Sequence, residues 1–161
     1  MLRLSRLTDY AVVVLIRLAE GERGGSGRGE EGVQTSPGIA AATGVPEPTV
    51  AKVLKALACA GLVASQRGAH GGYRLARPLA AISVVDVIAA VDGPIALTAC
   101  VDGGASGCDV ASLCAVRGRW ELVNDAIRAA LDRITLADMR AIPLPLPPPL
   151  RMKLAAPEAA Q

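Results

Sequence analysis

Residues 36–59 read SPGIAAATGVPEPTVAKVLKALAC, and this stretch decides the fold. Ser36 suits the N-cap of a helix, Pro37 suits its first position, and Gly44 suits its end. After a Val-Pro-Glu-Pro linker, a second helix is predicted from Thr49 to Cys59. Two short helices joined by a turn that contains glycine are typical of a helix-turn-helix, whose second helix enters the DNA major groove.

The predicted second helix has two chemically different faces. Its apolar residues recur at helical spacing and are expected to face the core: Val50, Val53, Leu54 and Leu57. Thr49, Lys52 and Lys55 fall on the opposite face. We expect Thr49 and Lys52 to read bases, and Glu47 or Pro48 at the helix start are further candidates. Lys52 and Lys55 are expected to contact phosphates, although a purely solvated role fits Lys55 equally well.

A β-hairpin is predicted next along the chain. Two strand-like segments, 62–65 and 73–75, flank the sequence QRGAHGG, whose three glycines and two cations suit close approach to a nucleic-acid backbone. Arg67 and His70 are expected to reach an adjacent minor groove, and Arg74 is expected to contact phosphates. This hairpin would form the wing of a winged helix.

Charge is unevenly distributed, although the net charge of the chain is only +2. Residues 34–77 hold five basic side chains and one acidic one, whereas the residues from 78 onward hold seven basic and nine acidic ones. A local excess of this kind is the electrostatic footprint expected of a phosphate-binding face. On charge alone, a solvated surface explains it equally well.

Three cysteines, Cys100, Cys108 and Cys114, fall within fifteen residues of a stretch rich in Gly and Asp. Thiolates are the preferred ligands of iron–sulfur clusters, and the intervening glycines make a pliable loop. Spacing alone leaves open an iron–sulfur cluster, a zinc ion or ordinary loop cysteines. Zinc normally takes four ligands, commonly from Cys-x2-Cys pairs, which the sequence lacks. The fourth cysteine, Cys59, is expected to be buried as a small hydrophobe.

The remaining elements are predicted to be helical. Thr8 and Asp9 suit the cap of a helix over 10–19, and Ser83-Val-Val-Asp86 resembles a capping box that opens a helix ending at Val91. Further on, apolar residues recur at steps of three and four: Trp120, Val123, Ile127, Ala130 and Ile134. This seam suits pairing between subunits or packing within one.

We therefore predict a mainly α fold with a small β-hairpin wing. Its parts are a winged helix-turn-helix domain over 1–93 with a Gly-rich insertion at 21–33, a cysteine loop over 94–118, a long dimerisation helix over 119–141, and a Pro-rich disordered tail over 142–161. No segment has the pattern of a secretory signal or a membrane span, so we expect a cytoplasmic protein with reduced cysteines. The sequence contains neither a nucleotide-binding loop nor a group of acid–base residues that would indicate an enzyme.

Several motifs carry a family resemblance. Leu7-Thr-Asp-Tyr-Ala11, the wing Arg67-Gly-x2-Gly-Gly-Tyr-x-Leu75 and the cysteine triplet resemble the IscR/NsrR-type winged-helix iron–sulfur regulators. Segments 82–88, 93–98 and 134–138 are most similar to the regulators of SUF-system cluster assembly. The resemblance implies a homodimer on a roughly palindromic promoter site in double-stranded DNA. It also implies a 2Fe–2S or 4Fe–4S cluster on the three cysteines, and repression of assembly genes by the cluster-loaded form.

The fourth cluster ligand is where the chain departs from the family. In the IscR-like branch a His follows the last cysteine by three residues, but Arg117 occupies that position here and cannot ligate. In the nitric-oxide-sensing branch an Asp from the first helix of the other subunit completes the site, and Asp9 matches it. Asp102, Asp109 or solvent are the alternatives, and Asp9 also suits an ordinary helix-start carboxylate. The competing functions are a winged-helix repressor with structural zinc and a cluster-carrying scaffold that binds no DNA.

Overall fold

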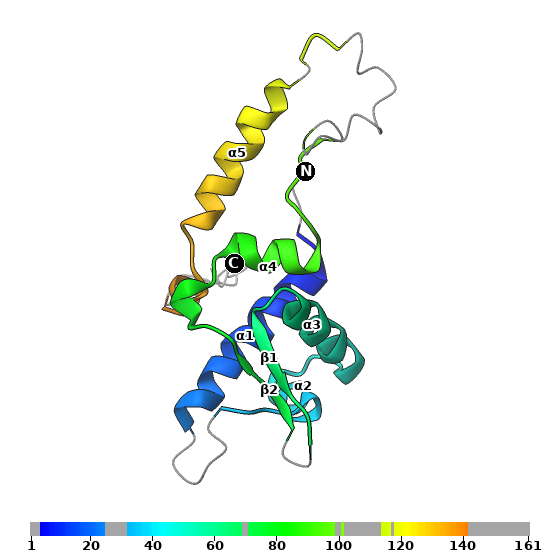
Figure 1. Ribbon diagram of the computed structural model, residues 1–161, viewed down its shortest axis with the longest axis vertical. Coiled ribbons are helices and arrows are strands. Elements are labelled where there is room, and N and C mark those ends of the chain that lie inside the picture. Colours follow the sequence, from blue (N-terminus) through cyan, green and yellow to red (C-terminus); the bar gives the residue numbers. More distant parts are fainter. Residues whose placement is uncertain are drawn as a thin grey trace, which may run out of the picture.

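The computed structural model describes residues 4–24, 32–68, 71–98, 101, 114–116 and 118–141. In chain order the elements are α1 (Arg6–Gly24), α2 (Ser36–Thr43), α3 (Glu47–Cys59), β1 (Val63–Gln66), β2 (Gly72–Leu75), the 3-10 turn η1 (Leu79–Ala81), α4 (Val84–Val91), α5 (Arg119–Asp132) and α6 (Leu136–Ala141). Figure 1 shows α1 running through the centre, with α2, α3 and the hairpin beside it and α5 projecting away from them. The predicted fold class, mainly α with a two-stranded wing, is confirmed.

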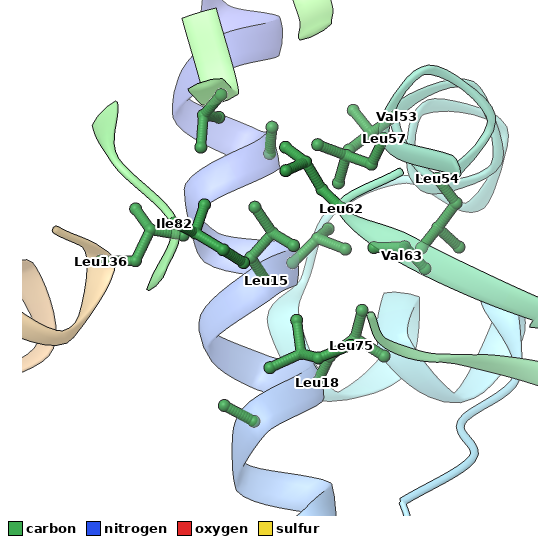
Figure 2. Packing of buried hydrophobic residues seen from close by; sticks show 14 of the residues in the cluster. Leu15, Leu18, Val53, Leu54, Leu57, Leu62, Val63, Leu75, Ile82 and Leu136 are labelled. Carbon is green, nitrogen blue, oxygen red and sulfur yellow. The ribbon is translucent and has the colours of Figure 1, made fainter. Parts of the chain in front are cut away.

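The core is built around α1 from aliphatic side chains, because the chain has no Phe. Figure 2 shows α3 and the hairpin, with Leu57 and Val63, on one side of α1, and Ile82 with Leu136 on the other. The apolar face predicted for the second helix is fully buried, as its spacing required: Val50, Val53, Leu54 and Leu57.

The helix-turn-helix forms as predicted, with two differences at its boundaries. The N-cap of α2 is Thr35 rather than Ser36, because Thr35 has an extended backbone and its Oγ1 accepts a 3.2 Å hydrogen bond from the Gly38 N–H. Gly44 ends α2 in the left-handed conformation with φ of 72°, as expected of a terminal glycine. Helix α3 begins at Glu47 instead of Thr49, because the Pro46 carbonyl already accepts from the helix backbone.

Helix α1 begins at Arg6, four residues before the predicted start at Tyr10. The Thr8 side chain does not cap α1; it is buried, and its hydroxyl donates to Asp92 at the end of α4. Helix α1 also extends to Gly24, into the predicted Gly-rich insertion at 21–33, of which residues 25–31 lie outside the described part.

Gln34 joins α1 to the wing. Its backbone pairs with Tyr73, which adds an isolated bridge to the antiparallel β1–β2 ladder. The Gln34 Nε2 donates to the carbonyls of Arg17 and Leu18 at 3.0 and 3.2 Å. A Cβ at Gly21 would collide with the end of the Gln34 side chain, so a larger residue there would displace Gln34 from these hydrogen bonds. The wing is therefore fixed to the central helix by side chain and backbone together.

The predicted single helix over 119–141 is wrong, because the chain breaks into α5 and α6. Between them, the Ile134 carbonyl accepts from Val84 N and Leu136 N donates to the Ile82 carbonyl, at 2.9 and 3.0 Å. The Thr135 Oγ1 accepts from Asp138 N at 3.2 Å, as an N-cap for α6. Leu136 is thereby turned into the core, where it is completely buried.

Candidate DNA-binding surface and cysteine site

The outer face of α3 holds the predicted base-reading and phosphate-binding side chains. Lys52 and Lys55 are exposed and Thr49 is half-buried, on the face opposite the buried Val50 and Val53. Within the described part of the chain, neither lysine makes an ion pair or a side-chain hydrogen bond. Both ammonium groups are therefore available to an external anion such as a phosphate.

Cys59 also lies on this outer face, so its predicted burial is wrong. Helical geometry gives the reason, because Lys52, Lys55 and Cys59 recur at steps of three and four and so share one face. Cys59 lines a groove of about 480 Å³ between α3 and the hairpin, together with Lys55 and Tyr73. The three-four spacing was a readable signal for its exposure.

The wing presents cations on two sides. Arg67 is exposed just beyond the end of β1, and Arg74 is exposed on β2. Arg74 pairs with Ala64 in the ladder, whereas its neighbour Tyr73 lines the groove toward α3. Because successive side chains of a strand point to opposite faces, Arg74 lies on the hairpin face turned away from that groove. His70 at the wing tip lies outside the described residues.

Arg77 differs from the other basic residues of this region. Its Nη2 lies 3.3 Å from Asp86 Oδ2, so it forms an ion pair with the first turn of α4. Asp86 also completes the predicted capping box with Ser83. The basic excess of residues 34–77 is therefore reduced to four cations without such a partner in the described residues: Lys52, Lys55, Arg67 and Arg74.

The structure describes only the edges of the cysteine loop. Cys114 is half-buried, while Cys100 and Cys108 lie outside the described residues, as do Asp102 and Asp109. Before the loop, Leu97 N donates to Asn124 Oδ1 of α5 at 3.2 Å, and the Val101 side chain is buried. Among the described residues, no group of three or more His, Cys, Asp and Glu side chains is placed to hold a metal ion.

Asp9 lies on the first turn of α1 and is exposed. It opens onto a groove of about 830 Å³ between the start of α1, α4 and α6, lined on its apolar side by Val12, Val84, Val87 and Met139. Asp92 lines the same groove. Partial burial raises the pKa of Asp92, but hydrogen bonds from Ser5 and Thr8 outweigh this and hold the pKa below its ordinary value.

Helix α5 leaves apolar side chains uncovered. The exposed large hydrophobic residues of α5 are Trp120, Leu122 and Val123, and Ile134 follows two residues after the end of the helix; all but Leu122 belong to the predicted seam. The one buried residue of α5 is polar, Asn124. Trp120, Val123 and Ile134 are therefore left exposed by the rest of the described chain, whereas Ile127 of the same seam is half-buried. Among those residues, no helix is long and apolar enough to cross a membrane.

Residues 4–141 match the family model of Rrf2, described as an iron-dependent transcriptional regulator. The chain belongs to the Rrf2 family. The winged helix-turn-helix and the projecting helix described above agree with this assignment, because solved structures of similar regulators have the same fold. This Rrf2 protein is a DNA-binding transcriptional regulator and not an enzyme, as the activities named for its relatives show.

Similar proteins cover most of this Rrf2 chain. A helix-turn-helix-type transcriptional regulator of Mycobacterium tuberculosis is 33% identical over 147 residues, covering 89% of this chain and 84% of its own length. IscR of Yersinia pestis is 40% identical over 79 residues, covering 49% of this chain and 47% of its own.

Among solved structures, CymR, the global cysteine regulator of B. subtilis, is 29% identical with a TM-score of 0.61, and 86% of this chain and 96% of that one are covered. IscR of T. potens is 32% identical with a TM-score of 0.57, with 86% of each chain covered. Solved structures of a similar fold thus include both CymR and IscR.

Proposed function

We propose that this Rrf2 regulator is a homodimeric, cytoplasmic repressor of iron–sulfur cluster assembly genes. In this proposal it senses cluster supply, iron or redox status through a 2Fe–2S or 4Fe–4S cluster held by Cys100, Cys108 and Cys114. The observation that carries the proposal is the grouping of three cysteines directly after the winged helix-turn-helix. Its likeness to IscR supports the same interpretation.

The donor set fits such a cluster in its chemistry. Thiolate sulfur is the ligand that iron–sulfur clusters prefer, and all three cysteines lie on one segment. Cys114, which the structure describes, is a half-buried free cysteine. Three protein sulfurs leave one position for a weaker ligand, which suits a labile sensor. Asp9 of the second subunit is our candidate for that position.

DNA contact would combine α3 and the wing. Thr49 and Lys52 are proposed to read base edges from the start of α3, while Lys55 contacts the phosphate backbone. Arg67 and His70 would follow from the wing tip toward a minor groove. The exposure of the two lysines, free of ion pairs in the described residues, supports this assignment.

Arg74 is proposed as a separate phosphate contact. It lies on the hairpin face turned away from the α3 groove, so it would meet a different stretch of backbone from Lys55. Its exposure and its freedom from ion pairs in the described chain support this role.

Dimer formation would cover the apolar seam that runs along α5 and continues to Ile134. Trp120, Val123 and Ile134 are each between 41% and 44% exposed in the single chain. Leaving this apolar surface in contact with water is unfavourable, and burying it against a second copy would be favourable. A second copy supplies an identical seam and the groove beside Asp9. Contact with that groove would also bring Asp9 to the other subunit.

Two alternative functions differ from cluster sensing in their chemistry. The likeness to CymR, a global cysteine regulator, favours a regulatory role linked to cysteine in place of cluster assembly. The second alternative is a regulator with a structural zinc ion on the same three thiolates, although the sequence lacks the paired Cys-x2-Cys ligands that are common at such sites.

Anaerobic purification followed by visible spectroscopy and analysis of iron, sulfide and zinc tests the proposal. We expect a brown protein with iron and sulfide in equal amounts, and loss of both in the Cys114→Ala variant. A colourless protein with stoichiometric zinc would replace the cluster by a structural site. A colourless protein free of metal would favour the cysteine-type response.

A further inference from the structure

The segment that leads into the cysteine loop is held at both of its ends. At the first end, Asp92 Oδ2 accepts from Thr8 Oγ1 at 2.7 Å and from Ser5 N at 3.4 Å, which fixes it to the start of α1. At the other end, Leu97 N donates to Asn124 Oδ1, which fixes it to α5. A stretch of six residues therefore connects the DNA-binding domain to the projecting helix.

Asn124 is unusual within α5. It is 1% exposed, while the large apolar residues around it, such as Val123 and Leu122, are exposed. Burying a polar side chain is unfavourable unless it finds hydrogen-bond partners, so the contact with Leu97 compensates a real cost. The contact between α5 and the incoming chain thus depends on a directional bond as well as on apolar packing.

The position of Leu97 gives this bond its significance. Cys100 follows three residues later, and the chain on its far side is also held, because Val101 N donates to the Thr98 carbonyl at 3.1 Å and the Val101 side chain is 6% exposed. Asn124 therefore holds the backbone three residues before the first candidate ligand.

We infer that Asn124 is a positioning residue that couples the cysteine loop to α5. A change in the loop on binding its cofactor shifts the backbone at Leu97, and the hydrogen bond to Asn124 transmits that shift to α5. The Asp92 contact transmits the same shift to the first turn of α1, a helix that packs against α3. The role of the cofactor here rests on the proposed function, whereas the mechanical link does not.

Asn124→Leu keeps the approximate shape of the side chain and removes the acceptor. In the cofactor-free protein we expect hydrogen exchange at the Leu97 amide to become about tenfold faster, the effect of losing one intramolecular hydrogen bond. Asn124→Asp keeps an acceptor oxygen and should retain slow exchange. Asp125→Asn, an exposed change on the same helix, is the matched control and should leave the Leu97 amide unaffected.

The second readout is the ratio of promoter affinities between the cluster-loaded and cluster-free protein. Allosteric ratios are typically about 5–150-fold, and we expect Asn124→Leu to bring the ratio close to one while the cluster-free affinity stays at the wild-type value. Asp125→Asn should keep the wild-type ratio. A purely structural role for Asn124 would instead weaken DNA binding in both forms equally.

Each outcome decides one claim. Unchanged Leu97 exchange in Asn124→Leu, or an undiminished affinity ratio, overturns the inference. If the wild-type protein shows no ratio at all, the proposed function fails, and exchange at Leu97 still decides whether Asn124 fixes the loop. Should Asn124→Leu fail to fold, Asn124→Ser, whose hydroxyl is too short to reach Leu97, provides the same two measurements.

Discussion

The Thr8 hydroxyl donates a 2.7 Å hydrogen bond to Asp92 Oδ2, joining the first turns of α1 to the end of α4 across 84 positions of sequence. Thr8 is 2% exposed, so its hydroxyl has little access to water as an alternative partner. Thr8 directly precedes Asp9, the candidate fourth ligand, and Asp92 directly precedes Gly93, from which the chain continues toward the cysteine loop. The bond therefore connects the two sequence segments that the proposed sensor has to coordinate.

Replacing Thr8 by Val should lower the free energy of unfolding by about 1 kcal/mol at neutral pH, since it removes one hydrogen bond to a largely exposed carboxylate. The native pKa of Asp92 lies below its ordinary 3.8, so the contribution of the carboxylate is complete above that pH. It is lost as the pH falls through the lower native pKa. Urea unfolding of both proteins from pH 7 to pH 3 should show the difference shrinking at the acid end; an equal difference at every pH would contradict this origin.

Leu136→Ala tests whether α6 is part of the DNA-binding core. Because Leu136 is completely buried, we expect a loss of about 2–5 kcal/mol in the free energy of unfolding. Leu122→Ala on α5 is the matched control, since that side chain is 76% exposed and its removal should change little. Equal midpoints for both variants in denaturant would show that α6 does not pack as described.

Arg67→Ala should weaken binding to all DNA sequences, because Arg67 is proposed to contact the backbone or a groove without base specificity. The slope of log affinity against log salt should fall by about 0.9, the contribution of one neutralised phosphate. Arg77→Ala serves as the control, because its guanidinium is already paired with Asp86. A salt slope that is the same for Arg67→Ala and the wild type would remove Arg67 from the interface.

Val123→Asp places a charge in the apolar seam of α5 and should dissociate the proposed dimer, because an unpaired carboxylate cannot be buried there cheaply. The folded monomer should persist, since Val123 is 44% exposed in the single chain. Leu122→Asp, outside the seam, should leave the dimer intact. Sedimentation velocity distinguishes the two, and a Val123→Asp variant that still sediments as a dimer would move the interface elsewhere.

Much of the fold could be predicted because its signals are local. The turn glycine Gly44, the apolar spacing of the second helix and the capping box at Ser83 each act within a few residues, and all three are found in the structure. The wing was predictable for the same reason, as two short strands around a Gly-rich turn.

The errors came mainly from interactions that are distant in sequence. Nothing adjacent to Thr8 indicates that its partner is Asp92. Ile134 completes an apolar repeat, yet α5 has already ended at Asp132 and the Ile134 carbonyl accepts from Val84 N. Thr135 and Asp138 did carry a local signal, the spacing of a capping box, and it favoured a new helix over continuation of the seam. Of the three candidate cluster ligands, the structure describes only Cys114, because Cys100 and Cys108 lie outside the described residues.

The central claim is that cofactor occupancy of the three cysteines sets DNA occupancy. The most direct measurement is the promoter affinity of one protein preparation before and after anaerobic removal of its cluster, at fixed salt, beside the Cys100→Ala, Cys108→Ala and Cys114→Ala variants. We predict that the loaded wild type binds several-fold more tightly, within the typical allosteric range of about 5–150-fold, and that each variant matches the cluster-free wild type. Equal affinities in the two wild-type states, or variants that keep both cluster and response, would contradict the account.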